Sequence, residues 1–458
     1  RPLRLRGAGN RTAGAGSRWK MGARARRTAR CLKPGADGRR WVLGRRAKLA
    51  LGAMLRSPAL FQAKSSRSLD RLRQEWLELF RLQSVLETSA GPTRCAPVFL
   101  DHHLCHAAST FLVSPFDRAA ILVVDGASEA DSAMLAVGEG TNIRVLSRVA
   151  LPHSLGQFYA AMTSFLGFRP DHDEYIVMGL AAYGAPRFAD TLRRQVLSFQ
   201  PEGQFRVNTC LLDFHLARLR RFVPEFQQLL GPPRQPDREI TQYHRDLAAS
   251  VQVVLEDTLL HMAKYLKQLT GAGALCLAGG VAQNCVANSR LCHEAGFDQV
   301  FIQPAPGDAG TGMGAALWWS ARQGRMKERT VLSHAYWGPR FSVEECRQAL
   351  AGAGLMWEEV DESSLCERIA SELAQGRLVF WFQGRMEWGA RALGNRSLLA
   401  DPRRADIREL INARVKLREP FRPFAPSVLE ERAGEFFDQA EPSPFMLRTF
   451  PVRAAAQG

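Results

Sequence analysis

Three histidines lie within five residues in the segment DHHLCHAAS, residues 101–109. If this segment is a helix, His102 and His106 share one face, which suits two imidazoles binding one metal ion. The spacing alone fits ordinary polar or core histidines as well. Asp125, after the apolar run of 119–124, and Asp308, in a Gly-rich turn, each place a carboxylate at the end of a predicted strand. Together these residues form a mixed nitrogen and oxygen set suited to Fe(II), Mn(II) or Zn(II).

Two Gly-rich segments, GGVAQN (279–284) and PGDAGTGMG (306–314), each join a predicted strand to a predicted helix. Glycines let the backbone approach a nucleotide, and the helix that follows offers its N-terminus to an anionic group. Tight packing turns use the same residues, so each loop alone leaves both interpretations open. The pair of loops favours a phosphate site.

The C-terminal part holds a dense polar cluster, FQGRMEWGARALGNRSLLADPR (382–403). Its arginines alternate with apolar residues and glycines, and Glu387 is expected to orient one guanidinium. A second segment, VKLREPFRPFAPSVLEE (415–431), adds Lys416, Arg418 and Arg422 between prolines. A solvated basic surface is the alternative interpretation. The alternation favours a cleft that binds phosphate or carboxylate through the arginines Arg385, Arg391, Arg396, Arg403 and Arg404.

The elements that must position these residues follow an α/β pattern from about residue 95. We expect strands at 119–126, 131–140, 143–151, 274–280 and 378–384, and a strand, loop and helix over 299–319. We expect helices at 156–168, 239–269, 282–296, 342–354 and 363–376, and a loop-rich insertion at 199–238. A boundary near 325–345 predicts two α/β domains, 95–335 and 341–458, after a basic and poorly ordered tail, 1–94.

Charge and cysteine content exclude several classes of function. The net charge is +16, but residues 1–50 contain 16 Lys and Arg and a single acid, Asp37, so the remainder is close to neutral. Nucleic-acid binding is therefore not expected of the folded part. No apolar run approaches the length of a membrane span, so no membrane association is expected. Nine scattered cysteines without a CxxC pair predict reduced thiols and a cytoplasmic protein.

Seven motifs in series resemble the carbamoyltransferases related to nodulation protein U and to the cephem and tobramycin carbamoylating enzymes. The resemblance covers about 95–450 and rests on DHHLCHAAS, VVDGASE, HDEYIVMGLAAYG, LAGGVAQNCVAN, PAPGDAGTGMGAAL, QGRMEWGARALGNRSLLADPR and KLREPFRPFAPSVLEE. It implies an actin-like ATPase domain, of the type that makes threonylcarbamoyl-adenosine in tRNA, followed by a truncated YrdC-like α/β domain.

The resemblance also implies a reaction. The second domain would convert carbamoyl phosphate and ATP, with Mg, into carbamoyl-adenylate, and the first would transfer the carbamoyl group to a hydroxyl of a small molecule or sugar. Fe(II) or another divalent cation would be held by His102, His106, Asp125 and Asp308. His103 would shape the site or help to activate the hydroxyl.

The resemblance further assigns roles to individual residues of this sequence. Catalytic roles beside His103 fall to Arg385, Arg391, Arg396 and Arg422. Nucleotide contacts fall to Gly279, Gly280, Val281, Asn284 and Gly310. Carbamoyl phosphate contacts fall to Arg385, Arg391, Asn395, Lys416 and Arg418. A homodimer is one expected assembly.

The sequence departs from the family pattern in ways that predict a chain incomplete at both ends. The opening strands with an EERFSR-type segment and a later LNTSFN-like segment are absent, and Ile176, Ala182 and Ala390 replace a lysine and two prolines. Two alternatives to an active carbamoyltransferase therefore stay open. One is an inactive fragment that binds only nucleotide and metal, and the other is a relative of the tRNA-modifying threonylcarbamoyl transferases.

Overall fold

The computed structural model describes residues 98–214, 221–438 and 441–456. The predicted basic tail, 1–94, lies outside the described residues. None of the helices in the described part is long and apolar enough to cross a lipid bilayer.

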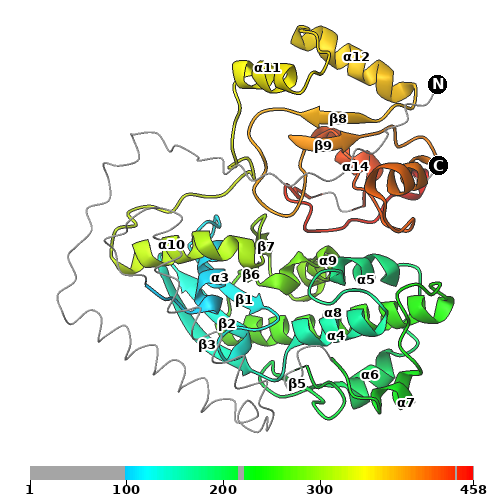
Figure 1. The fold of residues 1–458 in the computed structure, drawn as a ribbon. Coiled ribbons are helices and arrows are strands. Elements are labelled where there is room, and N and C mark those ends of the chain that lie inside the picture. Colours follow the sequence, from blue (N-terminus) through cyan, green and yellow to red (C-terminus); the bar gives the residue numbers. More distant parts are fainter. Residues whose placement is uncertain (1–97, 215–220, 439–440, 457–458) are drawn as a thin grey trace, which may run out of the picture. The chain divides into compact units, whose positions relative to one another are not determined.

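A five-stranded mixed sheet organises the first half of the described chain (Figure 1). Its strand order is β3-β2-β1-β6-β7, with bounds Arg118–Val124 (β1), Asp131–Glu139 (β2), Asn142–Ala150 (β3), Ala274–Ala278 (β6) and Gln299–Ile302 (β7). The first three strands are antiparallel neighbours, whereas β1, β6 and β7 run parallel. The carboxyl ends of these three parallel strands therefore meet at one edge, where ligands bind in open α/β sheets.

Both faces of the sheet are covered, and the alternation along β1 shows how. Leu122 and Val124 belong to one hydrophobic core, and Ile121 and Val123 belong to the other. Helices α3 (His102–Phe111) and α10 (Thr311–Arg322) pack together, and α3 lies on the second core. The first core is covered by α4 (Leu155–Phe165), α5 (Glu174–Ala181), α8 (Gln242–Thr270) and α9 (Cys285–Glu294).

The insertion between α5 and α8 has short elements of its own. They are α6 (Ala189–Gln195), the antiparallel hairpin of β4 (Leu197–Phe199) and β5 (Phe205–Val207), and α7 (Phe226–Leu230). The region was expected to be loop-rich. His261 of α8 secures the hairpin, because its Nε2 lies 2.8 Å from the carbonyl oxygen of Gln200.

The C-terminal part is a smaller α/β arrangement with sparse burial. Its strands β8 (Val379–Phe382) and β9 (Arg396–Leu399) form an antiparallel pair. Its α-helices are α11 (Val343–Gly352), α12 (Glu362–Ala374), α13 (Ile407–Ile411) and α14 (Ala433–Phe436). A π-helical turn, Asn412–Lys416, follows α13, and 3-10 turns cover Glu430–Arg432 and Ala454–Ala456.

Most expected elements are confirmed within two or three residues, with one difference that matters for the site. The helix expected at 282–296 begins only at Cys285, because residues Gly280–Gln283 form a separate 3-10 turn. Asn284 then serves as the N-cap of α9, and its side chain accepts a hydrogen bond from the backbone N–H of Ala287. An Asn at this position satisfies one of the free N–H groups at a helix start.

Candidate metal and anion sites

Helix α3 presents His102 and His106 on one face, as their spacing predicts. Asp101 caps the helix and accepts a hydrogen bond from the backbone N–H of Leu104 at 2.9 Å. Arg148 of β3 in turn binds Asp101 at 2.9 Å and Asp131 at 3.0 Å. The cap residue and the first turn of the helix are therefore tied to the sheet.

Asp125 follows β1, and both of its carboxylate oxygens are used. Its Oδ2 lies 3.0 Å from Nε2 of His102 and 3.0 Å from Nε2 of His106. Its Oδ1 accepts hydrogen bonds from the backbone N–H groups of Gly126 at 2.8 Å and Gly280 at 3.1 Å. The carboxylate thus links the histidines to the turn that follows β6.

Asp308 reaches the same point from the turn before α10. A glycine in α10 allows the close approach, since a Cβ added at Gly314 would collide with the carbonyl oxygen of Cys105 in α3. The Oδ1 of Asp308 lies 3.5 Å from Nε2 of His102 and 3.4 Å from Nε2 of His106. Its side chain is 80 % exposed, so this cluster opens to solvent on the Asp308 side.

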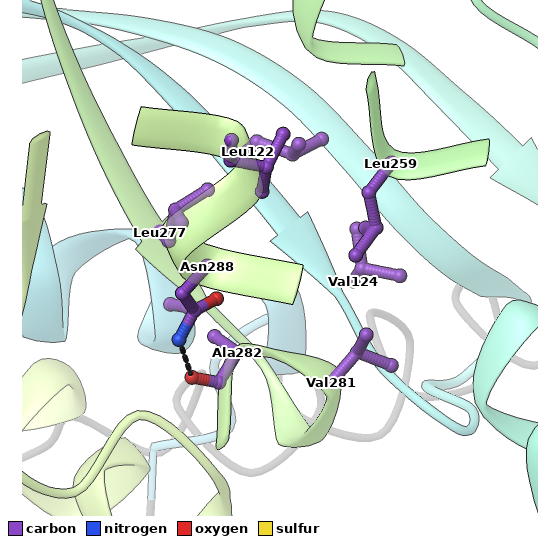
Figure 2. A pocket seen from close by; sticks show the side chains of 9 residues that line it. Leu122, Val124, Leu259, Leu277, Val281, Ala282 and Asn288 are labelled. Carbon is purple, nitrogen blue, oxygen red and sulfur yellow. Dashed lines mark hydrogen bonds between the residues drawn. The ribbon is translucent and has the colours of Figure 1, made fainter. Parts of the chain in front are cut away.

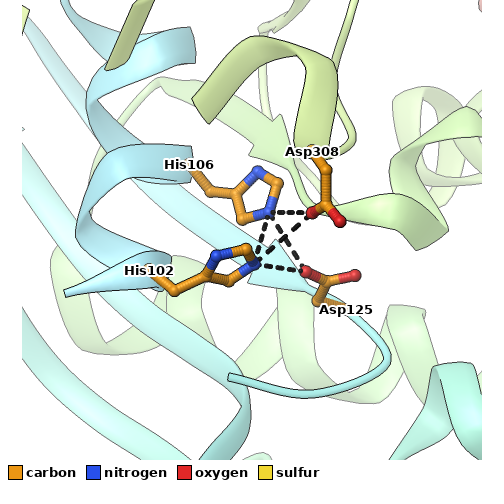
Figure 3. A group of neighbouring side chains, drawn as sticks. All are labelled: His102, His106, Asp125 and Asp308. Atoms are coloured by element: carbon orange, nitrogen blue, oxygen red, sulfur yellow. Dashed lines mark hydrogen bonds and ion pairs between the residues drawn. The ribbon is translucent and has the colours of Figure 1, made fainter. Parts of the chain in front are cut away.

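Four ligand atoms therefore converge in the cluster of His102, His106, Asp125 and Asp308 (Figure 3). All four lie within 4.8 Å of one another, and the two imidazole Nε2 atoms are 3.1 Å apart. A ring nitrogen carries at most one proton, so hydrogen bonds cannot satisfy every one of these contacts. A single cation can, because ligands about 2.1 Å from one ion lie roughly 3.0–3.4 Å apart.

The electrostatics of the cluster also favour a cation. Hydrogen bonds to Asp125 and Asp308 raise the pKa of His102 to about 10. Burial lowers the pKa of His106, but its hydrogen bonds to the same two carboxylates outweigh burial and raise it. Burial raises the pKa of Asp125, whereas hydrogen bonds from the histidines hold that pKa far below its usual range. The carboxylates therefore attract positive charge, which either protons or a metal ion supply.

His103, the third histidine, is fully buried, and burial lowers its pKa to about 4. Neither ring nitrogen has a hydrogen-bond partner among the described residues. Its ring centroid lies 5.7 Å from that of His102 and 6.4 Å from that of His106. His103 is therefore a neutral side chain that solvent does not reach. The role predicted for it in activating a hydroxyl stays a prediction.

The glycine loop, residues 279–284, lies directly beside the cluster. Gly279 has φ +94°, and a Cβ there would collide with the carbonyl oxygen of Val124, so a larger residue cannot adopt this turn. Gly280 donates its N–H to Asp125, as described above. The side chain of Asn284 pairs with the buried amide of Gln252 at 2.9 and 3.0 Å, which leaves it few free hydrogen-bonding groups. Predicted nucleotide contacts here fall mainly to the backbone.

A small cavity behind this loop is too small for a nucleotide (Figure 2). Its volume is about 10 Å³, which is room for one water at most. Apolar side chains line it except for Asn288, whose Nδ2 donates to the carbonyl oxygens of Ala282 and Leu447. The cavity is a packing feature of the first core.

The arginine loop, residues 385–396, connects β8 to β9. Arg385 donates to the carbonyl oxygen of Gly338 at 2.9 Å, and Arg396 stacks on Phe382 with 3.5 Å between its Cζ and the ring centroid. Arg391 is half-buried, and its Nε has no partner among the described residues. None of these three arginines has an acidic partner within 4 Å in the part of the chain that the structure describes, so their charges are available to an external anion.

Two other arginines that were predicted to bind an anion have acidic partners. Arg403 and Arg404 pair with Asp401 and Asp406 at 2.7 and 2.8 Å.

On the segment 415–431, Arg418 donates to the side chain of Asn412 at 2.7 Å. Arg422 lies 3.7 Å from Glu419 and stacks on Tyr175 of α5. Lys416 is exposed. The predicted anion residues are therefore not equivalent, and those of the arginine loop have the least compensated charge.

The arginine loop and the loops at the sheet edge are in contact. A Cβ added at Gly389, whose φ is +121°, would collide with the carbonyl oxygen of Pro304, which precedes Asp308 in the chain. Burial raises the pKa of the Cys285 thiol at the start of α9, and the positive charge of Arg391 lowers it in part. The arginine loop thus contacts the loop that follows β7 and leads to Asp308.

Comparison with known proteins assigns the chain to a family. The family model described as carbamoyltransferase N-terminus matches residues 82–317, and that described as carbamoyltransferase C-terminus matches residues 370–458. This chain belongs to the carbamoyltransferase family.

The carbamoyltransferase chain is also similar to longer curated proteins. It is 39% identical to the uncharacterized protein sll1178 of Synechocystis, over 87% of this chain and 67% of that protein. It is 40% identical to nodulation protein NolNO of Sinorhizobium fredii, over 80% of this chain and 52% of that protein. It is 40% identical to nodulation protein NolO of Bradyrhizobium diazoefficiens, over 78% of this chain and 64% of that protein. The chain spans between about half and two thirds of the length of these relatives.

Among solved structures, HypF of T. kodakarensis aligns over 54% of this chain and 40% of its own, with 14% identity and a TM-score of 0.28.

Three residues beside the site were missed by sequence reasoning. Glu129 accepts a hydrogen bond from the backbone N–H of His102 at 3.3 Å, and Arg148 binds Asp101, the N-cap of α3. The side chain of Gln157 lies against Gly126, since a Cβ added to that glycine would be 3.1 Å from its Nε2. Glu129 lies in the VVDGASE motif, which gave a usable signal. Arg148 lies in the strand 142–150, and Gln157 in a helix, where neither residue stands out by type or spacing.

Proposed function

We propose that the protein is an ATP-dependent O-carbamoyltransferase that uses carbamoyl phosphate and passes the carbamoyl group, as carbamoyl-adenylate, to a hydroxyl of a small molecule or glycan. The observation that carries the proposal is the convergence of two histidines and two aspartates at the sheet edge that the arginine loop contacts. Family membership supports carbamoyl transfer in general. The strand order β3-β2-β1-β6-β7 supports the actin-like assignment of the first domain.

The two groups of residues suit the two halves of this reaction. Carbamoyl phosphate is an anion, and Arg385, Arg391 and Arg396 offer guanidinium groups without acidic partners among the described residues. Guanidinium forks bind phosphate oxygens in pairs. Formation of carbamoyl-adenylate consumes one water and releases phosphate and pyrophosphate, so the arginines would hold substrate and product charge.

At the sheet edge, the four ligands would hold Fe(II) or another divalent ion, which supplies charge stabilisation at a phosphate oxygen. His102 and His106 would offer Nε2, and Asp125 and Asp308 one oxygen each. The backbone N–H groups of the glycine loop and the N-terminus of α9 would orient the nucleotide. The exposed side of Asp308 would leave an approach for the acceptor hydroxyl.

The state of the cysteines fits a protein that works in a reducing compartment. All seven described cysteines are free thiols, which is typical of a cytoplasmic protein.

Carbamoyl-phosphate-dependent exchange of pyrophosphate into ATP, with Fe(II) and Mg present and no acceptor, tests the adenylating half of the proposal. We expect exchange by the unmodified chain and its loss in Arg391→Ala. Arg377→Ala is the matched control, because Arg377 is exposed and paired with Glu372 at 2.8 Å. Absence of exchange in a folded protein that still binds metal would contradict the proposal for this chain.

A further inference from the structure

Glu387 lies inside the arginine loop, and its role differs from the expected one. Sequence reasoning expected it to orient a guanidinium. No side-chain nitrogen of an arginine or lysine among the described residues lies within 4 Å of its carboxylate. Its Oε1 instead accepts three backbone hydrogen bonds, from Leu393 at 2.8 Å, Asn395 at 2.8 Å and Arg396 at 3.1 Å.

Three N–H groups that converge on one oxygen form an anion-binding nest. In this loop the anion is the protein's own carboxylate. Burial raises the pKa of Glu387, but the hydrogen bonds from Leu393, Asn395 and Arg396 outweigh it and lower the pKa, so the group is charged at neutral pH.

Further contacts depend on the turn that Glu387 holds. Asn395, which is nearly buried, donates its Nδ2 to the carbonyl oxygen of Arg385 at 2.7 Å. The guanidinium of Arg396 donates to the carbonyl oxygen of Asn395 at 2.8 Å. Gly394, with φ +100°, completes the turn. Arg385, Arg391 and Arg396 are therefore spaced by a backbone whose path is set by one carboxylate.

The carboxylate of Glu387 binds backbone N–H groups and no arginine side chain among the described residues. An acid that paired with a guanidinium would reduce the attraction of the loop for an external anion. An acid that binds only N–H groups fixes the loop and leaves that attraction largely in place.

We propose that Glu387 is a positioning residue, which holds the backbone of residues 393–396 and thereby fixes Arg391 and Arg396 for binding of a phosphate-bearing anion. The proposal rests on the proposed function for the chemical class of that anion. It predicts a requirement for an acceptor oxygen at this position, and not for a negative charge.

Isothermal titration of the full chain with carbamoyl phosphate tests the proposal, using Glu387→Ala, Glu387→Gln and the surface control Glu435→Ala. We expect Glu387→Ala to weaken binding at least about tenfold, because displaced binding groups lose their alignment. Glu387→Gln keeps an acceptor oxygen and should bind within about threefold of the unmodified chain. Glu435 is exposed and pairs with Arg432, so its loss should change nothing.

A second measurement separates positioning from general loss of structure. Binding of Co(II) to the cluster of His102, His106, Asp125 and Asp308 should be the same in all variants. Unchanged binding of carbamoyl phosphate by Glu387→Ala, or equal losses in the Ala and Gln variants, would overturn the proposal.

The two proposals can also fail separately. If the unmodified chain binds carbamoyl phosphate in a Glu387-dependent way but shows no pyrophosphate exchange, the positioning role stands and the proposed reaction fails. If exchange occurs and Glu387→Ala leaves binding intact, the reaction stands and the positioning role fails. If the unmodified chain neither binds nor exchanges, both fail.

Discussion

Helix α3, which carries His102 and His106, buries eight of its ten residues, whereas α11 and α12 of the C-terminal part bury none. The metal-type cluster is accordingly positioned by packing, since its ligands extend from the end of β1, from α3, which packs on the sheet, and from the turn before α10. The arginine loop is positioned by hydrogen bonds, chiefly those of Glu387. We expect the first site to tolerate changes of volume poorly, and the second to be sensitive to the loss of single hydrogen bonds.

The largest effect is expected when a ligand of the packed site is removed. Asp125→Asn should weaken binding of Co(II) or Fe(II) by about a hundredfold or more, because both the charge of the ligand and its hydrogen bonds from Gly126 and Gly280 change. Equilibrium titration with the metal measures this. Asp117→Asn, at the opposite end of β1, is the control. Equal affinity in the two variants would mean that Asp125 is no ligand.

The close contact between α3 and α10 offers the next test. Gly314→Ala should cost about 1–3 kcal/mol in the free energy of unfolding, because the added methyl group collides with Cys105. It should also weaken metal binding, since Asp308 lies in the turn that leads directly into α10. Gly312→Ala in the same helix meets nothing within 4 Å and should stabilise the protein slightly. Chemical denaturation of both variants gives the comparison.

Low pH should weaken metal binding at the cluster of His102, His106, Asp125 and Asp308. Without an ion, hydrogen bonds to Asp125 and Asp308 raise the pKa of His102 to about 10, so this ring is mainly protonated at neutral pH. Burial lowers the pKa of His106, but hydrogen bonds to the same carboxylates outweigh burial and raise it. A metal must displace these protons, and its affinity should fall about tenfold per pH unit for each proton displaced as pH is lowered. Titrations from pH 8 to pH 6, in buffers of different ionisation enthalpy, measure the affinity and the protons released. Affinity independent of pH would contradict this.

A smaller effect is expected from the support of α3. Arg148→Ala removes the partner of the cap residue Asp101 and should weaken metal binding by about threefold to tenfold, because it acts on the ligands only through the helix. Arg144→Ala, in the same strand and exposed, should leave the affinity unchanged. The metal titration used for Asp125→Asn serves here.

The smallest effect concerns an arginine whose charge is already compensated. Arg403 pairs with Asp401 and its side chain is 75 % exposed, so Arg403→Ala should change carbamoyl phosphate binding by less than about twofold. Arg391→Ala should abolish it. If both variants lose binding equally, the distinction between paired and unpaired arginines is wrong.

The sequence predicted the packed site more completely than the arginine loop. The spacing of His102 and His106 and the strand that ends before Asp125 depend on local periodicity. Asp308 was expected at a strand end, but it lies in the turn before α10, since β7 ends at Ile302. All four side chains lie together in the structure. The helical turn at 280–283 was misplaced because its residues continue into α9 without a break in polarity. Helix α5 was missed, since EYIVMGLA is apolar around most of its circumference and lacks a clear period.

Glu387 shows why the remainder could not be predicted. A carboxylate among arginines suggests an ion pair when only residue types are known. Its actual partners are backbone N–H groups, which carry no sequence signal of their own. The loop that brings them together contains Gly389 and Gly394 at φ values of +121° and +100°. The path of a loop must be known before such an acceptor can be recognised.

Asp125 places two binding events on one carboxylate. One of its oxygens faces the histidines, and the other accepts the N–H of Gly280 in the glycine loop. A ligand that shifts this loop must change the field at the ion, and the ion must in turn change the affinity of the loop by the same factor, since such coupling is reciprocal. A spectroscopic ion such as Co(II) at the cluster would then report events at the loop as a change of colour.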